Sequence, residues 1–139
     1  SPALALPGDI LLVSNEVLVT HDDPAVAAGH ILAAMVGAEA APPLDRFLDG
    51  ISLTEIVALM TSGEVPDAAY ARHIEALLID PPAPPLEAVL RPAFAQARLN
   101  WAPWAASAGR AAAPPDAPGA MPPALDDTDW QSLRGICDP

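Results

Sequence analysis

The chain has 139 residues, enough for one domain, and 52% of them are hydrophobic, although many of these are alanines that add little to a core. Its 18 acidic residues against six basic ones leave a net charge of −12, which disfavours nucleic acid and anionic membranes as partners and favours basic ones. The single cysteine excludes an internal disulfide, and no apolar run reaches the roughly 18–20 residues of a membrane span. We expect a cytoplasmic protein.

The N-terminal twenty residues predict a small β element. Residues 1–8, with their prolines and glycine, are expected to form an extended leader. Ile10–Thr20 is rich in β-branched residues and holds the turn pair Ser14-Asn15 at its middle, which predicts a short hairpin. A single strand is the alternative, because neither half alternates cleanly between apolar and polar residues.

A helix is predicted from Pro24 to about Val36. Asp23 can accept a hydrogen bond from an unpaired backbone amide as N-cap, and Pro24 suits the first helical position. Gly37 is expected to end the helix. Gly29 in its middle either weakens the helix or lets another part of the chain approach closely.

The strongest helix signal is the capping box formed by Ser52 and Glu55, in which each side chain satisfies a backbone N–H. Behind it, apolar residues recur on one helical face at i, i+3, i+4 and i+7: Leu53, Ile56, Val57 and Met60. This pattern predicts a helix that ends at Ser62-Gly63. A single helical turn is expected before it, at Leu44–Leu48.

Two more helical segments complete the expected domain. One begins at Pro66-Asp67 and ends at the stiff proline-rich strut Asp80–Pro85. The other is Leu86–Asn100, which either kinks at Pro92 or begins again there. The predicted fold is therefore mainly α, a small bundle of four to five short helices with a minor N-terminal β-hairpin and an extended Pro-rich C-terminal arm.

The chain divides into a predicted α-rich core domain, residues 1–100, and a Pro/Ala-rich arm, residues 101–139, with a Trp-containing docking segment at its end. Trp101 and Trp104 open the arm with the i, i+3 spacing that would close the core at the end of the last helix. The alternative is an exposed aromatic patch for a partner. A spacer from Pro103 to Pro123 follows.

The segment Asp126–Cys137 is predicted to be a docking helix; the alternative is a flexible, solvated acidic segment. With Asp127 or Thr128 as N-cap, Trp130 and Leu133 fall on one face. Tryptophan and arginine dominate binding hot spots, and acidic residues suit a basic groove. The expected partner-binding residues are Trp130, Leu133, Arg134, Asp127, Asp129 and Trp104. The sequence leaves open whether Trp130 and Leu133 dock on this chain's own helices or on another protein.

Two stretches resemble known families. LDGISLTEIVALM followed by VPDAAYARHIEALL resembles the helical half of peptide-recognition domains of the PqqD type; the matching residues are Leu48, Asp49, Gly50, Glu55 and Ile56. This resemblance implies that the β element at Ile10–Thr20 binds a leader peptide by edge addition. Residues Leu59–Leu78 also resemble the helical N-terminal hairpin of anthranilate-phosphoribosyltransferase-like enzymes, which implies a dimerisation element.

Catalytic signatures are absent from the sequence. There is no Gly-rich phosphate loop, GxSxG, HExxH or CxxC motif. His21 beside Asp22 and Asp23 could ligate a metal, but no second cluster supports it, so we expect no metal and no cofactor. His30, within an Ala-rich helix, is expected to be structural. Cys137, beyond the proline-rich spacer, lacks the rigid support that a catalytic nucleophile needs.

These features predict a non-catalytic accessory or adaptor subunit. It would bind a larger protein partner with a basic or apolar groove, using the C-terminal arm as docking element, and a homodimer is a further option. The first alternative is a PqqD-like peptide-recognition domain that presents a leader or client peptide to a modifying enzyme. The second is a small enzyme with an unrecognised site.

Overall fold

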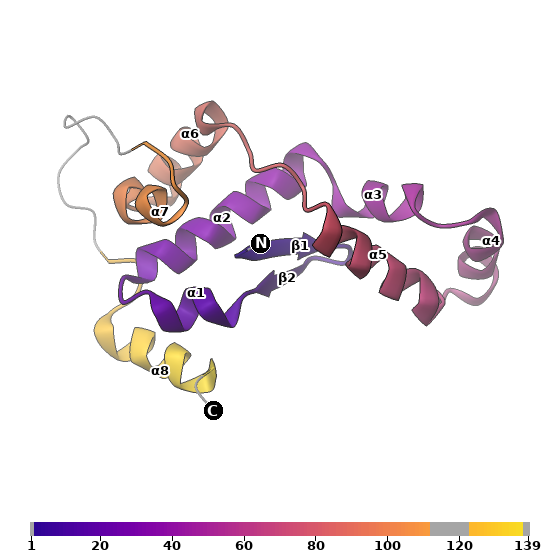
Figure 1. Ribbon diagram of the computed structural model, residues 1–139, viewed down its shortest axis with the longest axis horizontal. Helices are drawn as coiled ribbons and strands as arrows, with labels where there is room; N and C mark the ends of the chain where they lie inside the picture. The colour runs from indigo at the N-terminus through magenta and orange to yellow at the C-terminus, as the bar shows by residue number, and fades with distance from the viewer. Residues whose placement is uncertain (1, 112–122, 138–139) are drawn as a thin grey trace.

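The computed structural model describes residues 2–111 and 123–137, which form eight helices and a two-stranded antiparallel hairpin (Figure 1). The predicted mainly α fold with an N-terminal hairpin is confirmed, but four to five helices was too few. Most of the predicted proline-rich spacer lies outside the described residues. The elements are β1 (Ala3–Leu6), β2 (Ile10–Val13), α1 (Asn15–Thr20), α2 (Pro24–Ala40), α3 (Pro43–Asp49), α4 (Leu53–Ser62), α5 (Asp67–Ile79), α6 (Glu87–Ala97), α7 (Trp101–Ser107) and α8 (Asp127–Cys137).

The hairpin lies nearer the N-terminus than predicted, because the expected leader itself forms β1. The turn between β1 and β2 contains Gly8 and Asp9 with φ of 85° and 60°, a left-handed region that glycine and aspartate tolerate well. The predicted turn at Ser14-Asn15 is wrong. Ser14 is instead the N-cap position of α1, because the residue types that favour turns also begin helices.

The long helix α2 occupies the centre of the molecule. The Asp23 carboxylate accepts a hydrogen bond from the Ala25 N–H at 2.8 Å, so the predicted N-cap is confirmed. The helix does not end at Gly37 but continues to Ala40, since one glycine costs a helix only about 1 kcal/mol. It stops where Pro42 follows, because a proline disfavours helical geometry in the residue before it.

The largest buried cluster joins α2 to α6 and α7 around Phe94, Trp101 and Trp104. The Trp104 ring centroid lies 4.9 Å from those of both Phe94 and Trp101. Trp101 and Trp104 therefore close the core, as their spacing predicted, although they lie beyond residue 100. A Cβ atom at Gly29 would lie 2.5 Å from Trp104 Cγ, so the close approach predicted for this glycine is a contact with α7.

The segment Leu86–Asn100, predicted to kink or to begin again at Pro92, is interrupted later in the structure, after Ala97. Pro92 lies inside α6, where it removes one backbone hydrogen bond without ending the helix. The helix ends instead at Arg98, a non-glycine residue with φ of 54°. The side chain of Asn100 then accepts a hydrogen bond from the Ala102 N–H at 3.2 Å and caps α7.

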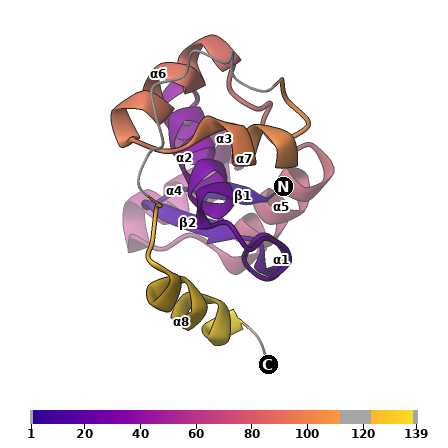
Figure 2. The ribbon, with the colours of Figure 1, turned by 90° about the vertical axis from the view of Figure 1, so that its left-hand side faces the viewer.

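The helices α3, α4 and α5 form a limb at one end of the molecule, on the right in Figure 1, and α8 lies beside α1 at the other end (Figures 1 and 2). This separation places α4 far from α8. In residues 2–111 and 123–137 no single helix is long and apolar enough to cross a membrane; α2 and α3 meet the test only as a pair bent by 58°.

Candidate functional site

The predicted docking helix α8 packs on this chain's own α1. Trp130 is 3% exposed and contacts Val17, Leu18 and Ala27, and Leu133 packs beside it. The helix begins one residue earlier than predicted, because the Asp126 carboxylate accepts the Asp129 N–H at 2.8 Å. The sequence left open where Trp130 and Leu133 dock. In the structure they pack on this chain's own helices.

Of the other predicted partner-binding residues, Arg134, Asp127 and Asp129 lie on α8, and Trp104 lies apart from them. The Arg134 guanidinium donates to the Val19 carbonyl and to the Asp22 carboxylate, both at 3.0 Å, which fixes α8 to the end of α1. Asp127 and Asp129 are exposed on α8. Trp104 is 2% exposed in the core and is not brought together with α8. A partner-binding role for these residues stays a prediction, with the two carboxylates as its accessible part.

The helix α4 carries an exposed apolar face, formed by Leu53, Val57 and Met60. Their side chains are 76%, 52% and 81% exposed. The sequence correctly predicted that these residues share a helical face. More than half of each residue stays uncovered by the described part of the chain, so the α4 apolar face is free to contact another molecule.

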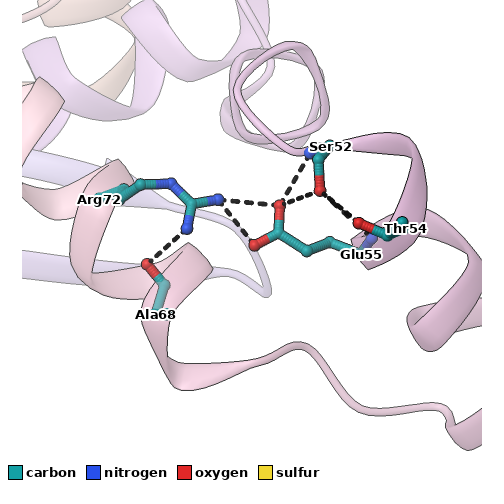
Figure 3. A network of polar contacts seen from close by, with 5 residues as sticks. All are labelled: Ser52, Thr54, Glu55, Ala68 and Arg72. Atoms are coloured by element: carbon teal, nitrogen blue, oxygen red, sulfur yellow. Dashed lines mark hydrogen bonds and ion pairs between the residues drawn. The ribbon is translucent and has the colours of Figure 1, made fainter.

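A polar network at the first turn of α4 fixes this helix to α5 (Figure 3). The Ser52 N–H donates to Glu55 Oε2 at 2.8 Å, and the Glu55 N–H donates to Ser52 Oγ at 3.4 Å, which completes the predicted capping box. Arg72 of α5 donates to both carboxylate oxygens of Glu55, at 2.7 and 2.8 Å. The hydrogen bonds from Arg72, and then from the Ser52 amide, lower the pKa of Glu55 to about 2.

A cavity of about 420 Å³ lies between β1, α2, the strut after α5, and α7. The sequence gave no sign of it, because its walls come from segments far apart in the chain. On one wall, the Trp104 indole N–H donates to His30 Nδ1 at 3.2 Å. His30 Nε2 lies 3.2 Å from Ser107 Oγ, whose hydroxyl donates to the Trp104 carbonyl at 2.8 Å.

The contact between Ser107 and His30 is not arranged for nucleophilic catalysis. Because Nδ1 accepts the Trp104 N–H, the neutral ring carries its proton on Nε2 and donates it to Ser107. A general base would have to accept the serine proton at that nitrogen. Burial, and secondarily His21, lowers the pKa of His30, which keeps the ring neutral. The predicted structural role of His30 agrees with these contacts.

The described residues also contain no group of three or more His, Cys, Asp or Glu side chains that could hold a metal ion. No protein-family model matches the chain, and neither a curated protein nor a solved structure matches it significantly. The likenesses of residues 48–78 described above thus concern local pattern. The α4 apolar face and the cavity are the features of the structure that bear on function.

Proposed function

We propose that the protein is a non-catalytic accessory or adaptor subunit that binds a larger protein partner, with α4 inserted into an apolar groove of that partner. The exposed α4 apolar face is the observation that carries the proposal. Leu53, Val57 and Met60 stand at i, i+4 and i+7, the spacing of the anchor residues that helices place in such grooves. Scattered exposed apolar residues would not share one face.

The rigidity of α4 supports the same function. An isolated helix of ten residues is marginal in water, so a partner that bound it would have to order it first. Here the capping box and the ion pair between Glu55 and Arg72 hold the helix before binding. Preorganisation of this kind lowers the entropic cost of association.

Charge defines the partner's chemistry. Acidic residues adjoin α4 in the chain, Asp49 before it and Glu64 and Asp67 after it, and the net charge is −12. A groove with an apolar floor and a basic rim is complementary to this surface. The exposed Asp127 and Asp129 of α8 offer a second negatively charged contact, so the C-terminal arm remains part of the proposal. A cytoplasmic location is also part of the proposal.

The test is affinity purification from the native source with quantitative mass spectrometry. The bait is the wild-type protein or a variant with Leu53→Gln, Val57→Gln and Met60→Gln. We expect chains that co-purify with the wild type to fall at least about tenfold with this α4 variant, since buried interface anchors commonly contribute more than 1.4 kcal/mol. The variant should fold normally because all three side chains are exposed.

A matched control carries Ile79→Gln at the end of α5 and Leu86→Gln just before α6, residues that are 78% and 75% exposed. This control should retain the partner, which separates a specific face from general stickiness. Undiminished recovery with the α4 variant contradicts the proposal. If the only chain recovered is this protein itself, sedimentation of the purified protein will show that α4 forms a homodimer.

A peptide-recognition domain is the second candidate, favoured by the open edge of β2. Among the described residues the sheet has two strands. The Ser14 N–H donates to the opposite Pro2 carbonyl, and hydrogen-bonded and non-hydrogen-bonded pairs alternate along an antiparallel ladder. The backbone N–H and C=O of Leu11 therefore point away from β1. A smaller depression of about 210 Å³ adjoins this strand. Leu11→Pro removes an outward N–H. If this variant loses the partner and the α4 variant keeps it, strand addition replaces helix docking.

A further inference from the structure

The cavity of about 420 Å³ beside α2 has the size of a small-molecule site and is separate from the α4 apolar face. None of its lining residues belongs to α4. The α2 wall is built from small residues, Ala33, Ala34, Gly37 and Ala38, which leave the space open. The facing wall includes the stiff segment Pro81–Pro85.

The cavity is held open by contacts of its own walls. Arg110, which follows α7, donates a hydrogen bond to the Pro85 carbonyl at 3.1 Å. The same guanidinium lies 5.3 Å from the centroid of the Trp104 ring, a cation–π distance. Arg110 thus links the proline strut to α7 and holds its positive charge at the cavity wall.

The charge around the cavity is opposite to that of the chain as a whole. None of the described lining residues is Asp or Glu, whereas two of them, Arg46 and Arg110, are arginines. The salt bridges in the described structure are formed by other arginines: Arg72, Arg91 and Arg134. In a chain of net charge −12, two arginines that form no salt bridge in the described structure therefore line one mostly apolar cavity.

The two histidines that line the cavity, His30 and His73, are neutral at neutral pH, so the arginines carry its positive charge. Burial, and secondarily the charge of Arg46, lowers the pKa of His73, and its Nε2 atom is buried without a hydrogen-bond partner among the described residues. His30 is neutral for the reason given above. Neither ring competes with an arginine for a negatively charged ligand at neutral pH.

We propose that this cavity binds a small carboxylic acid with an apolar body. Its carboxylate accepts hydrogen bonds from the guanidinium groups of Arg46 and Arg110, and its hydrocarbon part lies against the alanines of α2 and the proline strut. Arginine suits a carboxylate because its planar fork donates two parallel hydrogen bonds. The side chains of the lining alanines and prolines carry no polar group that the ligand body would have to desolvate.

The test uses the full-length protein and the medium-chain fatty acid decanoate, with decan-1-ol as neutral probe of the same chain length. Calorimetric titration gives the affinity, and the NMR signal of the Trp104 indole N–H reports binding inside the cavity. We expect decanoate to shift this signal and to bind about tenfold more tightly than decanol. Arg46→Gln should weaken decanoate about tenfold and leave decanol unchanged.

Arg98→Gln is the matched control, because it removes the same charge from an exposed arginine outside the cavity. Ala38→Phe, which fills the cavity from α2, should abolish binding of both probes while the circular dichroism spectrum stays that of the folded protein. The α4 variant should bind decanoate normally, so this proposal and the proposed function can fail separately. Equal affinities of the Arg46→Gln and Arg98→Gln proteins overturn the inference, as does failure of decanoate to bind.

Discussion

Gly29 is the residue that lets α7 lie directly against α2. Any side chain at this position would overlap Trp104, whose Cγ, Cδ1 and Cβ atoms all lie within 2.7 Å of the place a Cβ would take. The next residue, His30, then accepts the indole N–H of the same tryptophan. Two neighbouring residues of α2 therefore position one aromatic ring, which is both part of the core and part of the cavity wall.

Gly29→Ala should lower the free energy of unfolding by about 1–3 kcal/mol, because overpacking outweighs the gain of about 1 kcal/mol in helix propensity. Urea denaturation followed by circular dichroism measures the effect. Gly135→Ala in α8 is the control, since no atom lies within 4 Å of its new Cβ, and it should be neutral or stabilising. If both substitutions stabilise the protein alike, the packing of Trp104 against Gly29 is not as described.

At the scale of the elements, the link between α4 and α5 depends on an ionised Glu55. Its pKa is lowered from 4.5 to about 2, so the folded state binds the proton less readily than the unfolded state does. The stabilisation is therefore present above about pH 4.5 and is lost as the pH falls toward 2. Arg72 is half exposed, so solvent screens the pair and the effect should be modest.

Glu55→Gln tests this link. At pH 7 the variant should melt at a lower temperature than the wild type, and the difference should shrink as the pH falls from 4.5 toward 2. Glu64→Gln is a control of equal charge change, since Glu64 forms no salt bridge in the described structure. A wild-type advantage that is constant between pH 7 and pH 2 would contradict the assignment.

Features of the fold that depend only on neighbouring residues could be predicted from the sequence, and features that depend on tertiary packing could not. The caps of α2 and α4 follow from Asp23 and Ser52 alone, because a cap depends only on neighbouring residues. The break at Arg98 has no such signal, since it places a non-glycine residue at positive φ. Helical spacing predicted the faces of α4 and α8, but only tertiary packing decides that Trp130 is covered and Met60 is not.

At the scale of the whole molecule, α8 completes a small second core with α1. Trp130→Ala should lower the free energy of unfolding by about 3 kcal/mol, the lower end for a buried tryptophan, because the cluster is small and the indole N–H has no hydrogen-bond partner among the described residues. Thermal and urea unfolding by circular dichroism measure this. Ile136→Ala, on the same helix and 81% exposed in the wild type, should have little effect. A neutral Trp130→Ala would mean that α8 does not rest on α1 in solution.

The contact between α1 and α8 also determines when part of an aggregation-prone segment, residues 10–20, becomes buried. The ion pair from Arg134 to Asp22 joins residues 112 positions apart, so a long loop must close before Trp130 can cover Val17 and Leu18. Until then the stretch ILLVSNEVLVT, residues 10–20, lies uncovered on that side, and it has the β-branched, nearly uncharged character of aggregation-prone sequences. In the folded chain the helix predicted as a docking arm covers Val17 and Leu18, the buried residues of this stretch.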